Sequence, residues 1–147
     1  MLDDCKEIER KLINYGIALD SRKWDELNTI FSKDVSAVYG NEKIGMMIES
    51  KSRDEIINMC KASLGGCGTT QHLLGNFRID IRGETAESKC YVRAYHVGSI
   101  PNESEYYEMW GEYQDDWTKV NGEWLIIKRR LRVDNEAGNR DKVLAPE

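Results

Sequence analysis

The sequence predicts an α+β domain in which a cone-shaped, curved antiparallel sheet wraps around N-terminal helices. Apolar residues recur with a helical period in residues 3–31 and 52–64, whereas residues 70–133 alternate with a period of two. Helices that precede a run of strands are typical of α+β proteins. A strongly bent sheet with helices on one side leaves one open mouth, where small ligands bind. We expect residues 1–135 to form this single domain and residues 136–147 to form a polar C-terminal tail.

The first helix is predicted over residues 3–19 and ends at a carboxylate. Its apolar face consists of four residues at helical spacing: Ile8, Leu12, Tyr15 and Leu19. Asp20 continues a second stripe next to that face, so we expect it beside the core and not opposite it. Ser21 is the expected N-cap of a second helix, whose apolar residues are Trp24, Leu27, Ile30 and Phe31.

Two short strands and a third helix are predicted next. The strands are expected at residues 35–39 and 43–48. Ser52 and Glu55 have the spacing of a capping box, in which each side chain binds a backbone amide at the start of a helix. This helix should end after Leu64, because glycines follow and stop it.

Four longer strands complete the predicted sheet, at residues 70–82, 86–100, 106–119 and 124–133. Strict alternation places His72 on the face opposite the apolar series that starts at Phe77. Two adjacent leucines before Gly75 indicate a β-bulge that would turn His72 towards that face. His96 shares a face with Val92, which is typical of the inner side of a sheet.

The charge balance argues against nucleic acid as a partner. The chain has 147 residues, a net charge of -5 and a pI near 5.2. A nucleic-acid-binding domain is usually basic. The basic run from Lys128 to Arg132 lies in a predicted strand, so we expect it on a sheet face or in a subunit contact.

The apolar pattern and the N-terminal sequence indicate where the protein is located, and this location in turn indicates the redox state of its cysteines. No apolar stretch approaches the roughly 20 residues of a membrane span, and the acidic N-terminus does not resemble a signal peptide. We therefore expect a cytoplasmic protein with no membrane partner and with reduced cysteines. These cysteines are Cys5, Cys60, Cys67 and Cys90. No histidine pair accompanies them at the spacing of a zinc site.

Asp20, His72 and His96 are the candidate catalytic residues. A histidine bonded through one ring nitrogen to a buried carboxylate has a fixed tautomer, and its free nitrogen is a stronger base. Such a pair removes a proton next to a carbonyl group or passes one to a leaving hydroxyl. Each residue also has a plainer interpretation. Asp20 could be a surface residue at a helix end, His72 a polar residue at a strand end, and His96 a core histidine bonded to a backbone carbonyl.

Tyrosine hydroxyls are candidate donors to a developing oxyanion. Four tyrosines fit that role by position: Tyr15, Tyr39, Tyr95 and Tyr113. Most tyrosines in the chain should nonetheless be packing residues with a solvated hydroxyl. The sequence has no glycine-rich phosphate loop, no nucleophile elbow and no zinc-protease motif. Two histidines are too few for a three-histidine metal site, so chemistry without a cofactor or metal is the simplest prediction.

The layout resembles the SnoaL-like branch of the nuclear-transport-factor-2-like superfamily. The chain is similar to two dehydratases of that group, scytalone dehydratase and bile acid 7α-dehydratase, over roughly residues 5–133. The segments that carry the resemblance read ALDSRKWDEL, TTQHLLGN and WTKVNGEWLI. The resemblance implies a cone-shaped α+β barrel and a catalytic aspartate–histidine pair, which Asp20 and His72 match.

The same resemblance implies further site residues. His96 matches a second active-site histidine, and Tyr39 matches a tyrosine on the first short strand. Tyr15 matches a functional tyrosine five residues before the aspartate, and Arg132 approximately matches a late arginine. Three positions depart from scytalone dehydratase: Leu19, Gly111 and Tyr113. These departures leave the substrate undetermined, while Tyr113 stays a candidate substrate contact.

Three functions remain in view. The first is a cofactor-free lyase of the dehydratase type, in which His72 abstracts a proton and His96 or a tyrosine helps a hydroxyl to leave. The substrate would be small, cyclic and mostly apolar. The second is an isomerase or aldol-type cyclase that uses the same pair. The third is a non-catalytic module that binds a small ligand in the same cone.

A homo-oligomer is also expected. Trp110, Trp117, Trp124 and the segment 129–132 appear on one predicted sheet face, which is more apolar surface than a small domain usually exposes. The dehydratases that the chain resembles are trimers, and this resemblance favours a trimer over a dimer.

Overall fold

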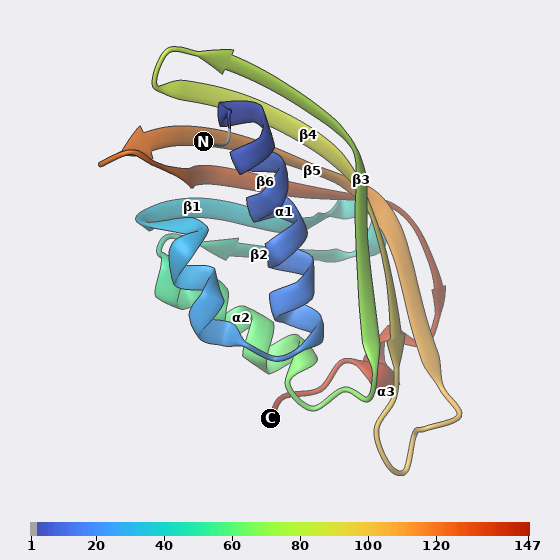
Figure 1. Cartoon of the computed structure of the whole chain (residues 1–147). Helices are drawn as coiled ribbons and strands as arrows, with labels where there is room; N and C mark the ends of the chain where they lie inside the picture. The colour runs from blue at the N-terminus through green and yellow to red at the C-terminus, as the bar shows by residue number, and fades with distance from the viewer. Residues whose placement is uncertain (1–2) are drawn as a thin grey trace.

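The fold is a curved six-stranded sheet with helices on its concave side (Figure 1). The computed structural model describes residues 3–147, so the first two residues of the predicted domain lie outside the described part. The helices are α1 (Asp4–Asp20), α2 (Arg53–Leu64) and α3 (Arg140–Val143), with the short 3-10 helices η1 (Trp24–Thr29) and η2 (Glu42–Ile44). The strands are β1 (Phe31–Asn41), β2 (Met46–Ser50), β3 (Thr70–Arg82), β4 (Thr85–Val97), β5 (Tyr106–Val120) and β6 (Glu123–Gly138).

The strand order is β2-β1-β6-β5-β4-β3, so β2 and β3 form the two edges of an open sheet. Strands β1 and β6 pair in parallel, while the other neighbours pair antiparallel. The predicted α+β class with a curved sheet around N-terminal helices is confirmed. The sheet differs from the prediction in having one parallel pair and in not closing into a barrel.

Helix α1 lies against β3 and forms the centre of the core. It begins at Asp3, whose side chain accepts a hydrogen bond from the Lys6 amide at 2.8 Å. Its predicted apolar face is buried, and each such side chain contributes about 1.5–3 kcal/mol through burial. A Cβ atom on Gly16 would lie 3.1 Å from the His72 carbonyl oxygen. The absence of a side chain at Gly16 therefore lets α1 approach β3 just where the histidine lies.

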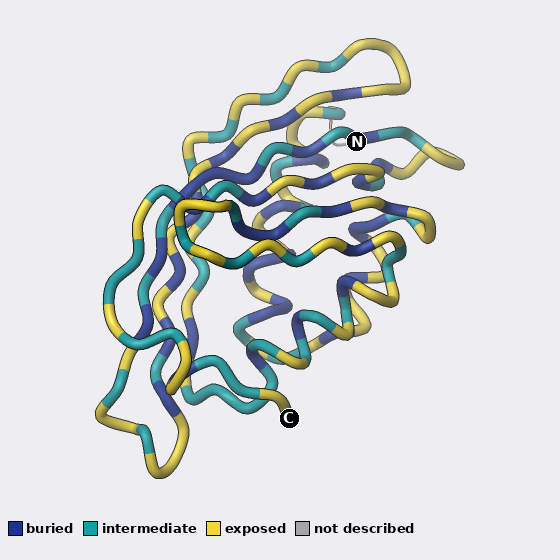
Figure 2. Tube along the Cα trace, turned by 180° about the vertical axis from the view of Figure 1, so that it is seen from behind, coloured by how far each residue is buried: buried dark blue, intermediate teal, exposed yellow. Residues whose placement is uncertain are grey.

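The predicted β-bulge in β3 is present and sets the direction of His72. The pairing with β4 shifts between Gly75 and Arg78, and Asn76 adopts a positive φ of 53°. The extra residue puts His72 on the same inner side as the series from Phe77 onwards, which strict alternation does not. Figure 2 shows the resulting alternation of intermediate and exposed residues along β3, and of buried and exposed residues along β4.

The predicted second helix is wrong in its length, because only a short 3-10 segment of it is present. Ser21 does not cap it, because its hydroxyl donates back to the Ile17 carbonyl at the end of α1, at 2.7 Å. Only the six residues of η1 are helical, and Phe31 already belongs to β1, where it pairs with Ile126 of β6. Phe31 is fully buried as part of the sheet, and this burial decides its conformation although its spacing from Leu27 also fits a helix.

The last residues pack against the domain and do not form the predicted tail. Strand β6 continues past residue 135 to Gly138, and Val143 of α3 is fully buried. The Ala145 amide donates to the Ser63 carbonyl at 3.0 Å, and the Gly66 amide donates to the Ala145 carbonyl at 2.8 Å. The C-terminal segment thus lies along the end of α2, as Figure 1 shows.

Most of the residues that were expected to form an exposed apolar sheet face, and so to indicate an oligomer, are buried. Trp117 and Trp124 are 1% and 0% exposed, and Arg129 is 1% exposed, because all three face the inside of the sheet. The oligomeric state therefore stays a prediction. Within residues 3–147, no helix is both long enough and apolar enough to cross a membrane.

Candidate active site

Asp20 and His72 meet where α1 ends against β3. Asp20 Oδ1 lies 2.7 Å from His72 Nδ1 and accepts a hydrogen bond from the Thr70 hydroxyl at 3.0 Å. Its Oδ2 accepts from the His72 backbone amide at 2.8 Å. A carboxylate can only accept, so His72 Nδ1 carries a proton, and in the neutral imidazole Nε2 is then the nitrogen with a free lone pair. This arrangement supplies a base with a fixed tautomer.

The carboxylate of Asp20 is kept ionised by its donors. Partial burial raises the pKa of Asp20. The hydrogen bonds from His72 and from the Thr70 hydroxyl, together with the charge of His72, lower this pKa by a larger amount. The net effect is a pKa below the ordinary value of an aspartate. Asp20 is therefore an anion at neutral pH, as its role beside a histidine base requires.

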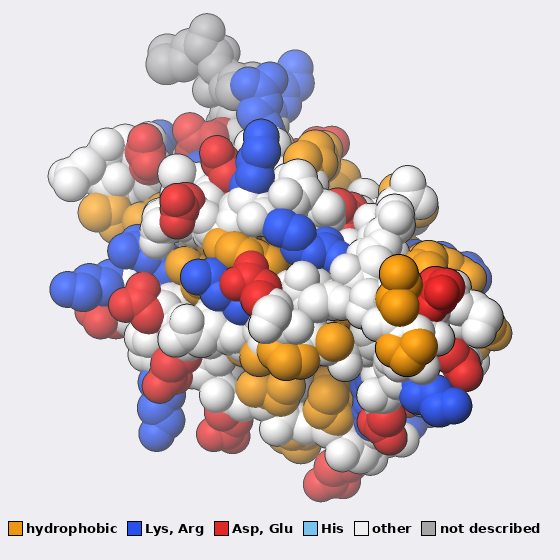
Figure 3. All heavy atoms as spheres, turned by 90° about the horizontal axis from the view of Figure 1, so that it is seen from below, with side chains coloured by type: hydrophobic (Ala, Val, Ile, Leu, Met, Phe, Trp, Pro, Cys, Tyr) orange, Lys and Arg blue, Asp and Glu red, His pale blue; other side chains and the backbone are white. Residues whose placement is uncertain are grey.

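An apolar cavity of about 80 Å³ lies between α1, α2 and the inner face of the sheet, and both histidines line it. Its polar lining residues are Tyr15, Tyr39, Ser63, His72, His96, Tyr107 and Tyr113. No aspartate, glutamate, lysine or arginine lines it within the described chain. Both histidine side chains are nearly inaccessible from outside. The face seen from below in Figure 3 carries hydrophobic side chains between charged groups.

His96 is buried and neutral. Its Nδ1 lies 2.8 Å from the Tyr107 carbonyl oxygen, which can only accept, so Nδ1 carries the proton. Burial, and to a smaller extent the neighbouring His72, lower the pKa of His96 to about 4. The two imidazole rings meet edge to face, with centroids 5.4 Å apart. At neutral pH His96 thus offers the cavity a hydrogen-bond acceptor, and the expectation that it donates a proton to a leaving group is not supported.

The protein should lose stability as the pH falls from about 6.5 to about 4. The unfolded chain takes up a proton on His96 over this interval, whereas the folded chain does not, at a cost of about 2–3 kcal/mol. His96→Gln removes this titration but keeps an N–H group for the Tyr107 carbonyl. Its unfolding free energy, measured in urea at about pH 7 and about pH 4.5, should depend less on pH by that amount. Identical pH dependence in both proteins would contradict the assignment.

Three tyrosines meet at the cavity wall opposite the histidines, namely Tyr15, Tyr39 and Tyr113. The Tyr15 and Tyr39 hydroxyls are 2.8 Å apart, and Arg129 Nη1 donates to the Tyr39 hydroxyl at 3.3 Å. Burial raises the pKa of Tyr39 to about 12 and also raises the pKa of Tyr15 well above its ordinary value, so both phenols keep their protons. Arg129 can only donate, so it occupies one acceptor position of the Tyr39 oxygen and favours the arrangement in which the Tyr39 proton points to Tyr15 and the Tyr15 proton to a ligand.

Arg129 and Asp115 form a buried ion pair behind these tyrosines. Their side chains are 0% and 1% exposed. Arg129 Nε and Nη2 donate to Asp115 Oδ1 and Oδ2 at 2.7 and 2.9 Å, and its guanidinium carbon lies 4.3 Å from the Tyr15 ring centre and 4.1 Å from that of Tyr113. Burial alone lowers the pKa of Arg129, but Asp115 raises it above its ordinary value. The pair holds the tyrosines in place.

Two predicted contacts lie outside the cavity. Arg132 is on the outer face of β6, where its side chain is 41% exposed and pairs with Asp134 at 2.7 Å. It does not line this cavity, whereas its neighbours Leu131 and Val133 do. Tyr95 is also exposed on the outer face and stacks on Tyr106.

The cavity thus brings together six of the seven predicted site residues, namely Asp20 (through His72), His72, His96, Tyr15, Tyr39 and Tyr113. Sequence reasoning missed Thr70, Asp115 and Arg129. Asp115 had a usable signal, because it shares the inner-face parity of Tyr113 and Trp117, and a carboxylate there needs a buried partner. In residues 3–147 no three histidine, cysteine, aspartate or glutamate side chains are grouped as a metal site.

Comparison with known proteins identifies the family and the fold of the chain. The sequence profile of the SnoaL-like domain matches residues 1–130. The chain belongs to the SnoaL-like family. A relative is the uncharacterized protein Rv2910c of Mycobacterium tuberculosis, which is 28% identical over 130 residues, or 87% of this chain and 84% of the relative.

Solved structures share the SnoaL-like fold along nearly the whole chain. A Novosphingobium aromaticivorans protein provisionally named scytalone dehydratase is 24% identical, with a TM-score of 0.78 over 96% of this chain and 91% of that one. The hexachlorocyclohexane dehydrochlorinase LinA-type3 of Novosphingobium barchaimii is 14% identical, with a TM-score of 0.75 over 97% and 94%. Similarity at this level of identity concerns the fold.

Proposed function

We propose that the protein is a cofactor-free lyase that eliminates water from a small, neutral hydroxy ketone. The observation that carries the proposal is the 2.7 Å contact between His72 Nδ1 and Asp20 Oδ1 beside an apolar cavity. This contact leaves His72 Nε2 as a base in a place from which water is largely excluded. The names of the dehydratase and dehydrochlorinase neighbours, both eliminating enzymes, agree with this reaction class.

The reaction begins with loss of a proton from the carbon next to the carbonyl group. The C–H electron pair forms an enolate, while the proton goes to His72 Nε2. The Tyr15 hydroxyl donates a hydrogen bond to the enolate oxygen, and Tyr39 and Arg129 direct that donor. The bond from the β-carbon to its hydroxyl then breaks, and the hydroxide takes the proton back from His72. The products are a conjugated ketone and water.

The cavity lining supports a neutral and compact substrate. A carboxylate or phosphate group would find no cation in the lining, and burying an unpaired charge is costly. The cavity of about 80 Å³ is smaller than the roughly 300–1,000 Å³ of most ligand sites. Three lining methionines, Met46, Met59 and Met109, can adapt to a ring or chain. His96 accepts a hydrogen bond from the substrate hydroxyl.

A graded panel of hydroxy ketones tests the proposal. We would incubate the protein with 4-hydroxy-2-butanone, 3-hydroxycyclohexanone and larger cyclic analogues, and follow the ultraviolet absorbance of the conjugated product. Parallel reactions in deuterium oxide, followed by NMR, report exchange of the proton next to the carbonyl. Elimination supports the lyase, and exchange with unchanged mass supports the isomerase or cyclase. Binding without either reaction, for every member of the panel, would contradict an enzyme acting on this class.

A further inference from the structure

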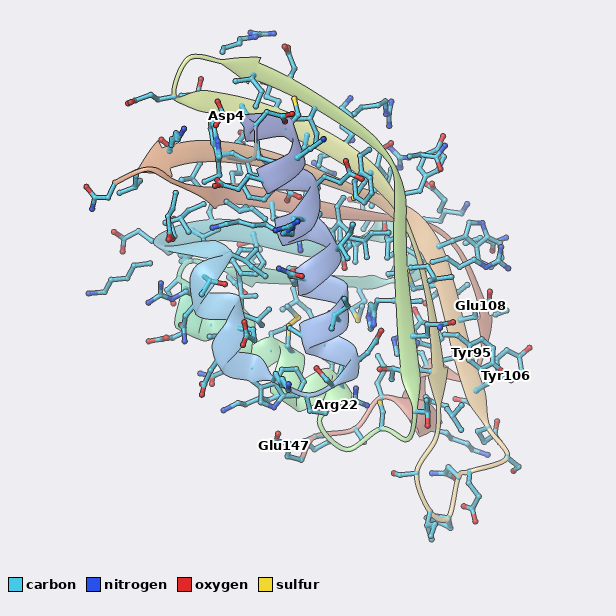
Figure 4. All side chains as sticks on the ribbon, viewed as in Figure 1. Asp4, Arg22, Tyr95, Tyr106, Glu108 and Glu147 are labelled. Atoms are coloured by element: carbon cyan, nitrogen blue, oxygen red, sulfur yellow. The ribbon has the colours of Figure 1, made fainter. Side chains whose placement is uncertain are left out.

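Arg22 links the end of α1 to the segment that enters β3. Its Nη1 donates to the Leu19 carbonyl and to the Thr70 hydroxyl oxygen, each at 2.8 Å. Its Nη2 donates to the Gly68 carbonyl, also at 2.8 Å. Figure 4 shows Arg22 at the end of α1, beside the loop that leads into β3. The side chain therefore ties together the two elements that carry Asp20 and His72.

These contacts fix the direction of a hydrogen-bond chain. A guanidinium group has donors only, so the Thr70 oxygen must accept from Arg22. The single Thr70 proton is then left for Asp20 Oδ1, 3.0 Å away. Together with the side chain and amide of His72, Thr70 completes three donors to one carboxylate. Oδ1 accepts two of these hydrogen bonds and Oδ2 accepts one, and each of them stabilises the ionised carboxylate.

We propose that Arg22 and Thr70 form a positioning unit that holds Asp20 oriented and ionised, so that His72 keeps its proton on Nδ1. For its consequence in catalysis, the proposal rests on the function proposed above. Neither residue faces the cavity, so both act through Asp20 and not on the substrate. Groups that hold a catalytic carboxylate in its productive orientation are expected to act in this indirect way.

The backbone of Arg22 supports a role for its side chain. Arg22 has a φ of 58°, in the left-handed region where glycine is the favoured residue at the end of a helix. A residue with a side chain costs about 1 kcal/mol there relative to glycine. The three contacts at 2.8 Å offset this cost. Glycine at this position would relax the backbone and remove the guanidinium, which separates the two effects experimentally.

The ionisable groups around Asp20 are few. His72 faces it from β3, Arg22 from the turn after α1, and His96 from β4 behind His72. Burial raises the pKa of Asp20, and the hydrogen bonds from His72 and Thr70 lower it. Loss of the Thr70 hydroxyl should accordingly raise the pKa of Asp20, and loss of Arg22, which polarises that hydroxyl, should raise it as well.

The test compares Thr70→Val, Thr70→Ser and Arg22→Gly with the wild type. The carboxyl carbon of Asp20, labelled with carbon-13, is titrated by NMR to give its pKa without any substrate. Thr70→Val and Arg22→Gly should raise this pKa, and Thr70→Ser, which keeps the hydroxyl, should restore the wild-type value. Thermal unfolding confirms that each variant is folded. An unchanged pKa in folded Thr70→Val, or equal effects of valine and serine, would overturn the proposal.

Turnover of 3-hydroxycyclohexanone gives a second readout. The kcat of Thr70→Val should fall roughly tenfold at constant KM, and the acid limb of its pH profile should move to higher pH. Thr70→Ser should show neither change. If the carboxyl pKa shifts as described but His72→Ala is fully active, the proposed function fails while the positioning unit stands. If His72→Ala is inactive and the carboxyl pKa is unmoved, the positioning unit fails alone.

Discussion

Replacement of His72 by alanine is expected to reduce kcat for elimination by about 10²–10⁴-fold, the range for loss of a general base. The imidazole is the one group in the cavity that combines an unprotonated nitrogen with a carboxylate partner. His96 cannot take over its role, because burial lowers the pKa of His96 to about 4 and its Nδ1 bonds a backbone carbonyl instead of a carboxylate. The measurement is the initial rate of conjugated-ketone formation from 3-hydroxycyclohexanone, with circular dichroism as the check of fold.

Asp20→Asn should approach the same loss by another route. An amide has a single oxygen acceptor, and if this oxygen keeps the bond from the His72 backbone amide, its NH2 group faces both the His72 ring and the Thr70 hydroxyl. The favoured adjustment is a change of the His72 tautomer, which would place the proton on Nε2 and remove the base. Gln71→Ala is the matched control, because this neighbour on β3 is exposed and contacts neither group. Full activity of either His72→Ala or Asp20→Asn would exclude the proposed mechanism.

The aspartate and histidine were predictable because local patterns place them. Helical spacing puts Asp20 beside the buried face of α1. The direction of His72 required one further step, the bulge after Leu74, which the adjacent leucines and Gly75 indicated. What the local pattern does not contain is the contact itself. The 2.7 Å distance depends on how closely α1 packs on β3 at Gly16.

Arg132 was a candidate only through its approximate match to a late arginine of the dehydratases that the chain resembles, and its outward direction has a physical cause in β6. Pairing with β5 shifts at Trp117, so the alternation that starts from Trp124 and Ile126 resumes one residue later. Arg129 consequently turns inward, and Arg132 turns outward. A single-strand pattern cannot reveal such a shift, because the extra residue is defined by the partner strand. The C-terminal segment resembled a free tail for another reason: its residues are mostly polar, and backbone hydrogen bonds to Ser63 and Gly66 help to hold it in place.

Loss of Asp115 is expected to be the most destabilising single change considered. In Asp115→Leu the Arg129 cation stays buried without its partner, which costs about 3–5 kcal/mol. A domain of this size has a free energy of unfolding of about 5–15 kcal/mol, so the variant should be marginally folded. Urea unfolding at neutral pH measures the loss. Glu108→Gln is the matched control, because it breaks an exposed pair with Arg93 and should cost about 1 kcal/mol or less.

The double variant Arg129→Met, Asp115→Leu separates the charge from the packing. Replacing a buried pair by apolar side chains of similar volume is often neutral or stabilising, so most of the lost stability should return. Activity should not return with it, because Tyr39 then lacks the Arg129 donor that directs its proton to Tyr15. A stable double variant with full turnover would show that the Tyr15 hydroxyl needs no direction from Arg129. A single variant as stable as Glu108→Gln would show that the buried charge is relieved in some other way.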